Sequence, residues 1–486
     1  MTSPSGSNPP PVEPIAAAGA APGAIDLPEA MAALRPRLGE AVAALEERTP
    51  YAAALLSSRG GLSILVERAE ETITQLPRAA GAVVSAFDGQ VLVERSVPGF
   101  DSQGWQRAVD RLRRDLPASS RRGDGRDADP APQDFVTVAR LPARALSLED
   151  KLERCRELRD RVAGYDPRIV NVRVSYTELR ETSVFRSRTA DLAQDITRLR
   201  LQVFVILGQN GDIRYDWLSR GGTGGWELVE IGDDELAETV AGAARLFSSE
   251  RIEPGEYAVV TGQGVSGVLA HESFGHGVET DLFPKERARA TDYVGRRVGS
   301  PLVTIIDDPS LPAAYSSYFF DDEGMLSRPA VIVEQGVFRG GITDMVSAHQ
   351  LGIPRTANGR RQDYTRKPYA RMSNTFFGPG QTPLQDMLAQ VERGVYLERW
   401  VNGMEDPQGW GIQITCHYGR EIRGGKITDR VFAPVSISGY VPQVLETIRA
   451  VSPSVALDQG TCGKGHKELV PNSSGGPHLL LQVHLG

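Results

Sequence analysis

Cysteines, histidines and long hydrophobic runs are scarce in this chain of 486 residues. The three cysteines, Cys155, Cys416 and Cys462, are too few for the disulfide framework of a small secreted protein, so we expect a reducing, cytoplasmic location. No segment approaches the roughly 18 consecutive apolar residues of a transmembrane helix. The N-terminus also lacks the basic and apolar regions of a secretory signal. The sequence therefore predicts a protein without membrane spans.

An excess of positive charge is also missing. The formal net charge is −8, with 54 lysines and arginines against 62 aspartates and glutamates. Such a chain has no overall basic field to attract nucleic acid or an anionic membrane. This balance disfavours a nucleic-acid-binding function and leaves only a local basic patch to consider.

The length and the ordinary globular composition predict two or three domains. Residues 1–25 are rich in proline, alanine, glycine and serine and predict a disordered tail, because they have little to bury. Residues 26–249 predict an N-terminal α+β domain, and residues 250–486 a mostly antiparallel, barrel-like β domain with few helices. The expected fold class is therefore α+β.

Hydrophobic periodicity and turn signals predict the elements of both halves. Asp88-Gly89 and Asn210-Gly211 are typical of two-residue hairpins, and Ser147 is a good helix N-cap. The expected helices cover residues 26–47, 102–116, 147–162 and 233–247. The expected strands cover 63–69, 83–87, 90–95, 170–178, 183–188, 199–207, 257–261, 302–307, 330–334, 412–418 and 426–431.

The candidate metal-binding and catalytic residues are concentrated in the stretch TGQGVSGVLAHESFGHGVETD, residues 261–281. Neutral imidazoles are good Zn²⁺ ligands, and a glutamate beside the first histidine can take a proton from water. His271 and His276 are five residues apart, however, which places them about 140° apart on a regular α-helix. Both can bind one metal if the helix contains a π-bulge, or if it ends near Gly275 and His276 turns back. The alternative is two unrelated histidines.

A tetrahedral zinc site with an open position needs a third protein ligand. The candidates are Asp281, Glu279, the remaining histidines and two cysteines, Cys416 and Cys462. Strand alternation places Cys416 with apolar neighbours, which favours a core thiol. Cys462 lies in a glycine-rich segment beside a lysine that favours the thiolate, so it is the better third ligand. Cys155 lies in a charged helix and is interpreted as structural.

Several separated segments resemble the TldD/PmbA family of zinc metallopeptidases, and specifically its catalytic TldD-type members. They are HESFGHGVETD at 271–281, FDDEG at 320–324, RTANGRRQDYTRKPYARMSNTFF at 355–377 and ALDQGTCGKGHKELVP at 456–471. The resemblance implies a two-domain α+β fold and a zinc ion held by His271, His276 and Cys462, with Glu272 as the catalytic glutamate. It also implies a heterodimer with a PmbA-type homologue lacking the metal motif, and action on small or unfolded peptides, including maturation of peptide natural products.

The chain departs from the family pattern after the cysteine, at GHKELVPNSSGGPH, and in the strand that carries Cys416, His417 and Arg420. We expect these changes to alter the pocket. Asp281 is a further expectation, as the hydrogen-bond partner of a ligand histidine.

The segment at residues 355–371 contains five arginines and a lysine, and three interpretations stay open: a nucleic-acid patch, a clamp for the substrate's backbone or carboxylate, or a solvated loop. Peptide binding ranks first, and the side chains expected to contact the substrate are Arg360, Arg361, Tyr364, Arg371 and Asn374. The sequence thus predicts a zinc-dependent peptidase; the alternative is a non-catalytic or regulatory subunit of such a complex.

Overall fold

The computed structural model describes residues 20–21, 25–116, 131–464 and 468–486. Most of the predicted disordered tail, most of the polar loop after residue 116, and His466 lie outside these residues. In the described part of the chain, no helix is long and apolar enough to cross a membrane.

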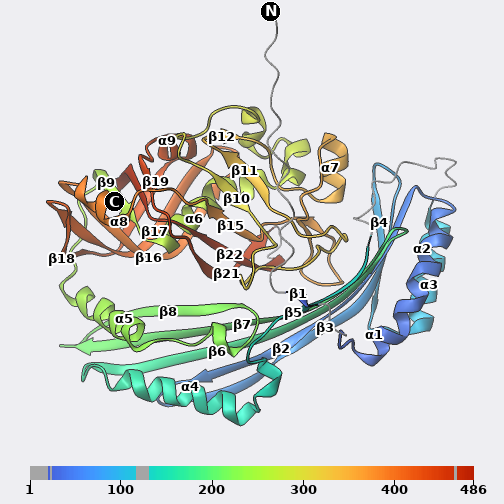
Figure 1. The fold of residues 1–486 in the computed structure, drawn as a ribbon, viewed down its shortest axis with the longest axis horizontal. Helices are drawn as coiled ribbons and strands as arrows, with labels where there is room; N and C mark the ends of the chain where they lie inside the picture. Colours follow the sequence, from blue (N-terminus) through green and yellow to red (C-terminus); the bar gives the residue numbers. More distant parts are fainter. Residues whose placement is uncertain (1–19, 22–24, 117–130, 465–467) are drawn as a thin grey trace, which may run out of the picture.

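The first part of the chain builds one eight-stranded sheet in the order β1-β5-β7-β6-β2-β3-β4, with β8 also paired to β7 (Figure 1). All pairings are antiparallel except β5 with β7. The strands are β1 (Ala20–Ala21), β2 (Tyr51–Val66), β3 (Glu71–Phe87), β4 (Leu92–Pro98), β5 (Ala131–Thr137), β6 (Ile169–Arg186), β7 (Ala190–Gln209) and β8 (Asp212–Thr223).

Helices cover this sheet in two groups with separate cores (Figure 1). The first group contains the helices between Glu29 and Asp115, which pack around Trp105 on one end of the sheet. The second group contains α4 and α5, which pack along β6, β7 and β8. The helices are α1 (Glu29–Leu34), η1 (Arg35–Arg37), α2 (Leu38–Glu46), α3 (Ser102–Asp115), η2 (Ala143–Ala145), α4 (Leu148–Ala163), η3 (Trp226–Leu228), α5 (Asp233–Arg245) and η4 (Leu246–Ser248).

Local signals in the sequence account for several of these boundaries. Ser147 caps α4 in a capping box with Asp150, as a Ser-x-x-Asp pattern favours. The Asn210-Gly211 hairpin forms with the expected two-residue loop. The prediction of a two-residue loop at Asp88-Gly89 is wrong, because Phe87 pairs with Leu92 and the loop has four residues. Gly89 and Gly211 both have positive φ. The helix expected over 233–247 begins at Asp233, as α5, and its N-cap is Gly232.

The second part of the chain contains a closed five-stranded barrel, as the expected barrel-like architecture requires. Its strands follow the order β16-β9-β23-β19-β17, and pairing of β16 with β17 closes the ring, with β18 attached outside. These strands are β9 (Gly255–Thr261), β16 (Arg393–Asp406), β17 (Gly411–Arg423), β18 (Lys426–Phe432), β19 (Val435–Tyr440) and β23 (Leu479–Leu485), with β20 (Ala450–Val451) on β23.

A six-stranded sheet in the order β12-β11-β10-β15-β22-β21 lies beside the barrel. Its strands are β10 (Ile305–Asp307), β11 (Ala330–Glu334), β12 (Val337–Phe338), β15 (Asn374–Phe377), β21 (Ala456–Lys464) and β22 (Glu468–Gly476), and β13 (Gly359–Arg360) pairs separately with β14 (Tyr369–Ala370). The helices are α6 (Gln263–Phe274), η5 (His276–Val278), η6 (Thr280–Lys285), η7 (Arg289–Tyr293), α7 (Met345–Leu351), α8 (Leu384–Ala389) and α9 (Val441–Glu446).

Candidate metal centre

Helix α6 is the central buried helix of the second part and packs against β15, β16 and β22. Its sequence is apolar on nearly every side, and Val265, Leu269 and Phe274 belong to the largest hydrophobic cluster. Gly267 permits this packing, because a Cβ there would lie 2.4 Å from the backbone nitrogen of Gly475 on β22. The helix thus holds its last turn at a fixed place between the barrel and the sheet.

The α-helix ends at Phe274, and His276 begins the short 3₁₀ helix η5. Gly275 forms the break with φ −101° and ψ −88°, and a Cβ on it would lie 2.0 Å from the carbonyl oxygen of His271. Of the two geometries considered from the spacing, the structure contains the helix that ends near Gly275, and not the π-bulge. The break turns His276 back toward His271.

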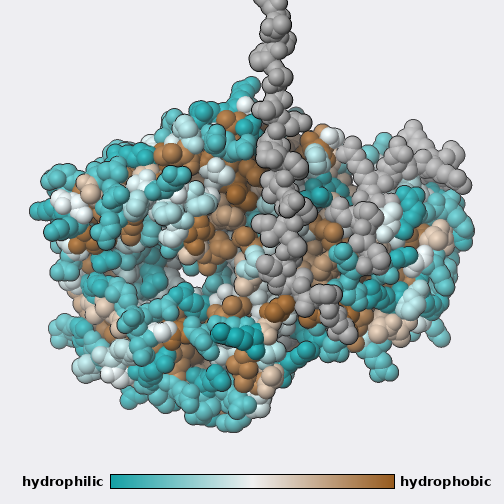
Figure 2. Space-filling view, viewed as in Figure 1, coloured by the Kyte–Doolittle hydropathy of each residue, from teal (hydrophilic) through white to brown (hydrophobic). Residues whose placement is uncertain are grey.

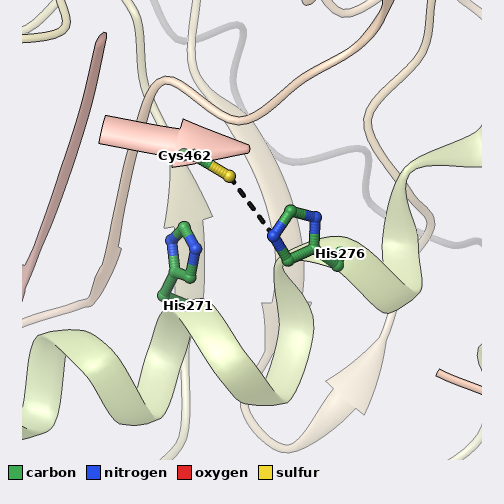
Figure 3. Close-up of side chains that lie close together, drawn as sticks. All are labelled: His271, His276 and Cys462. Carbon is green, nitrogen blue, oxygen red and sulfur yellow. Dashed lines mark hydrogen bonds between the residues drawn. The ribbon is translucent and has the colours of Figure 1, made fainter. Parts of the chain in front are cut away.

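Cys462 completes a cluster of three potential ligands (Figure 3). One donor atom from each of His271, His276 and Cys462 lies within 4.8 Å of the others. The Cys462 Sγ is 3.2 Å from His276 Nε2, and the two imidazole rings are nearly perpendicular, with centroids 5.4 Å apart. Cys462 lies on the regular strand β21 and is 4% exposed, so the glycine-rich segment around it is a strand up to Lys464.

Glu279 orients His276. His276 Nδ1 lies 3.2 Å from a carboxylate oxygen of Glu279, an arrangement in which Nδ1 donates its proton and Nε2 stays free to bind a metal. Glu279 itself is buried and pairs with Lys464 Nζ at 2.9 Å and Arg371 Nε at 3.3 Å. The expectation that Asp281 contacts a ligand histidine is wrong, because its carboxylate binds Lys464 instead, at 2.5 Å.

The two histidines favour the thiolate of Cys462. Burial alone raises the pKa of this thiol, but hydrogen bonds and charge from His271 and His276 lower the pKa well below its ordinary value. Burial lowers the pKa of His276, but the Glu279 charge and the contacts with Cys462 outweigh it and raise the pKa well above its ordinary value. Lys464, the lysine expected to favour the thiolate, is occupied by Glu279 and Asp281.

These residues fit a zinc ion. His271 Nδ1 is buried without a hydrogen-bond partner among the described residues, although buried polar atoms are almost always paired. Two imidazole nitrogens and one thiolate are donors that zinc prefers, and three protein ligands leave a fourth position open, as in catalytic sites.

Glu272 lies next to the cluster and is 8% exposed. Burial raises its pKa above the ordinary value, although the charges of His271 and His276 oppose this. Gly403 on β16 makes room for the carboxylate, because a Cβ there would lie 2.6 Å from Glu272 Oε1. A carboxylate held in this way can accept and return a proton.

A second carboxylate, which the sequence did not single out, lies close by. Glu405 on β16 accepts a hydrogen bond of 3.1 Å from the backbone N–H of Gly277, directly after His276. Burial raises the pKa of Glu405 well above its ordinary value. The segment around Glu405 carries no motif, and only the pairing of β16 with β9 and β17 brings it to the site.

The basic segment at 355–371 is not a solvated loop at the positions singled out. Arg360, Arg361 and Arg371 are 6%, 9% and 1% exposed. Arg361 pairs with Glu94 of the first part at 2.9 Å, and Arg360 donates to the carbonyl oxygen of Pro471 at 3.0 Å. Guanidinium groups buried in this way do not present a surface to nucleic acid.

Only one of the five expected substrate contacts lies beside the metal ligands. Arg371 donates to the backbone carbonyl of Cys462 at 2.9 Å and pairs with Glu279. Asn374 donates to the Asp308 carbonyl at 2.7 Å, and the Tyr364 ring packs over Gly81. The structure does not bring Arg360, Arg361, Tyr364 and Asn374 to the centre, and substrate contact by these residues stays a prediction.

The departures from the family pattern have separate explanations. Cys416 is fully buried and belongs to the same hydrophobic cluster as α6, as a core thiol should. His417 Nε2 donates to the carbonyl oxygen of Tyr215 at 2.7 Å, and Arg420 pairs with Glu398. None of the three is among the metal-ligand cluster.

Fold and site together define an α+β protein with a candidate metal centre of two histidines and a cysteine. The profile of the PmbA/TldA metallopeptidase C-terminal domain matches residues 254–484, and that of the central domain matches residues 141–247. A protein of Haemophilus influenzae named as a metalloprotease TldD homolog is 32% identical over 351 residues, covering 70% of this chain and 72% of the relative. The chain belongs to the TldD/PmbA metallopeptidase family.

Other relatives extend the match. A metalloprotease of Synechocystis sp. is 28% identical over 436 residues, covering 87% of this chain and 93% of the relative. A zinc metalloprotease TldD homolog of Saccharolobus solfataricus is 25% identical over 338 residues, with 69% and 75% coverage.

Solved structures share the fold. A Thermotoga maritima protein described as a candidate modulator of a DNA gyrase superposes with a TM-score of 0.74 at 17% identity, covering 90% of this chain and 96% of the other. TldE from Thermococcus kodakarensis superposes with a TM-score of 0.71 at 15% identity, covering 92% and 99%.

Proposed function

We propose that this chain is a zinc-dependent peptidase and that it hydrolyses amide bonds of small or unfolded peptides. The observation that carries the proposal is the placement of a buried carboxylate, Glu272, beside the His271–His276–Cys462 cluster. Curated relatives named as metalloproteases support the reaction class, and the name of the Saccharolobus relative supports zinc.

His271 and His276 would hold the ion through ring nitrogens, and Cys462 through its thiolate. Zinc bound there supplies Lewis acidity, which lowers the pKa of water and polarises a carbonyl group. Glu272 accepts the proton of the attacking water and returns it to the leaving amine. Glu279 keeps the proton of His276 on Nδ1, so that Nε2 stays available as a ligand.

We further propose that the chain works in a heterodimer with a PmbA-type homologue that lacks the metal motif, and that its substrates include precursors of peptide natural products. The fold shared with a protein named TldE supports such a pairing. A purely regulatory role is less well supported, because such a subunit has no need of four site residues in contact.

The catalytic assignment is tested with the Glu272→Gln variant, co-expressed with the homologue and assayed on a library of short peptides. We expect at least a ~100-fold loss of hydrolysis, since general base catalysis contributes factors of about 10² to 10⁴. Glu334→Gln is the matched control, because this exposed carboxylate lies on the surface, where it pairs with Arg339. Full activity in the Glu272 variant would refute the mechanism.

The metal assignment is tested by elemental analysis of the purified chain. We expect one zinc per wild-type chain and a strong loss of zinc in Cys462→Ala, which removes one ligand. Cys416→Ala removes an equally buried free thiol outside the cluster and should keep its zinc. If both variants retain zinc equally, Cys462 is not a ligand.

A further inference from the structure

A cavity of about 810 Å³ lies between the β7–β8 face of the first sheet and the second part of the chain. It opens on the side of α5, where Figure 2 shows the surface hollowed between the upper and lower parts of the molecule. Residues from α5, α6, β16 and β21 complete its walls. Neither the metal cluster nor Glu272 lines this cavity, so it is separate from the site where the proposed hydrolysis takes place.

Three elements connect this cavity with the metal centre. On α6, Val265 lines the cavity and Glu272 follows seven residues later, two turns along the same face. On β21, Asp458 lines the cavity, and Cys462, four residues on, points to the same side of the strand. On β16, Trp400 lines the cavity, and Gly403 contacts Glu272.

These spacings give the distance between the cavity and the candidate metal centre. Seven helical residues rise about 10 Å, and four strand residues about 13 Å. An extended peptide advances about 3.3 Å per residue. A peptide with one bond at the metal centre therefore reaches the cavity with a residue three or four positions away.

The floor of the cavity is aromatic. Phe204 on β7 and Trp217 on β8 are cross-strand neighbours on the same face of the sheet, with ring centroids 6.0 Å apart. Tyr215 stacks on Trp217, also with ring centroids 6.0 Å apart. Alternation along both strands places these rings on the face opposite the hydrophobic core beneath α4. Phe204 and Trp217 are half-buried and Tyr215 is 43% exposed. His417 of β17 packs against Tyr215 and Trp217, with ring centroids 4.8 and 4.9 Å away, so part of this floor stays open to a further ring.

Trp400 forms the opposite wall and is held in place. Its indole N–H donates to Asp458 Oδ2 at 2.8 Å. The preceding residue, Arg399, has φ 54°, and its guanidinium lies 3.2 Å from the buried Asp216. The β16–β17 register shifts directly after Trp400, between Trp400 and Asn402. Positive φ at non-glycine residues and β-bulges both recur beside binding sites in proteins.

We propose that this cavity is a subsite for an aromatic side chain of the peptide substrate, three or four residues from the bond that is cut. Trp217 and Phe204 stack on one face of the ring, and Trp400 closes over the other, in the offset arrangements that aromatic rings prefer. The proposal rests on the proposed function and adds a preference within the substrate class.

The test measures binding without turnover. Ten-residue peptides of alanine and serine, with one phenylalanine moved along the sequence, are titrated against the full-length Glu272→Gln chain by calorimetry. We expect one phenylalanine position to bind about tenfold more tightly than the peptide without an aromatic residue. Trp217→Ala and Trp400→Ala should each remove this preference and keep the zinc content and the weak binding of the plain peptide.

Tyr165→Ala is the matched control, because this exposed tyrosine lies outside the cavity. Equal affinity for every peptide, or a preference that survives in both tryptophan variants, would overturn the subsite. If one variant fails to fold, the other and Phe204→Ala decide the question. An aromatic preference in binding, with no peptide hydrolysed by the wild type, would refute the proposed peptidase activity and still support the subsite.

Discussion

Glu279 joins the candidate metal ligands to two buried cations. Its carboxylate contacts His276, Lys464 and Arg371, and all four side chains are mostly withdrawn from water. Burial raises the pKa of Glu279, but these cations lower the pKa far below its ordinary value, so the group stays ionised. One carboxylate thus sets the tautomer of a ligand and neutralises charges that would otherwise be costly to bury.

Substitution of this carboxylate should therefore affect both binding and stability. We expect Glu279→Gln to weaken zinc binding by 10- to 100-fold, the usual effect of removing such a partner. The loss of a buried charge beside two cations should also lower the free energy of unfolding by about 3 kcal/mol. Competition with a zinc chelator and urea unfolding measure the two effects.

Asp281→Asn is the informative comparison. Asp281 shares Lys464 with Glu279 but does not contact a metal ligand. We expect the Asp281 variant to lose some stability and to keep its zinc affinity. Equal zinc affinity in the two variants would show that the contact between Glu279 and His276 has no effect on metal binding.

The break between α6 and η5 is the element that makes a five-residue spacing usable. Gly275 is enclosed by the His271 carbonyl and by Met372 Sδ, which would lie 2.0 Å and 2.4 Å from a Cβ. Gly275→Ala must therefore move either the helix end or the strand beside it. We expect most of the bound zinc to be lost, with the secondary structure kept.

Gly340→Ala is the control for this change, because a Cβ at that position meets no atom within 4 Å and the backbone needs no positive φ. Zinc analysis and circular dichroism of the two variants separate a local effect from unfolding. A Gly275→Ala protein with full zinc occupancy would contradict the role given to the break.

Elements with strong local signals could be predicted from the sequence, and those defined by distant pairing could not. The Ser147 cap and the Asn210-Gly211 turn placed α4 and the β7–β8 hairpin correctly. β2 begins at Tyr51, twelve residues before the predicted strand at 63–69, because its small and polar residues show no clean alternation.

The same reasoning explains what was found and missed at the site. His271, Glu272 and His276 form a local motif. The glycine-rich segment and the lysine beside Cys462 favoured this residue as the third ligand, and the resemblance to a family implied the same choice. Glu405, Trp400 and Gly403 lie on β16, whose alternation is broken by the register shift between Trp400 and Asn402, so no strand was expected there. The contacts of Glu279 depend on Lys464 and Arg371, and no sequence spacing predicts that they meet.

The two parts of the molecule are held together by buried polar contacts. Arg198 on β7 is 2% exposed and donates to the carbonyl oxygens of Tyr315 and Ser317 in the second part, at 2.5 and 2.8 Å. Gln194 on the same strand accepts a hydrogen bond from the backbone of Phe319. These contacts lie on the sheet face that also forms the floor of the cavity, so they fix the width of the space above it.

Arg198→Leu should loosen this junction. The substitution leaves two buried carbonyls without their donor and removes one partner of Glu181, so we expect a loss of about 3 kcal/mol in the free energy of unfolding. Arg156→Leu removes an equally large but solvent-facing network on α4 and should change stability little. Thermal unfolding of the two variants tests this, and similar melting temperatures would speak against the junction.

The order of the ligands along the chain has a consequence for synthesis. His271 and His276 emerge from the ribosome 191 and 186 residues before Cys462, and the barrel cannot close until β23 joins β9 and β19. A nascent chain therefore has no complete centre while most of it is still unfolded and cleavable. If the chain has the peptidase activity proposed above, this activity begins only after β23 has been synthesised, so an incomplete chain cannot cleave itself or its neighbours on the ribosome.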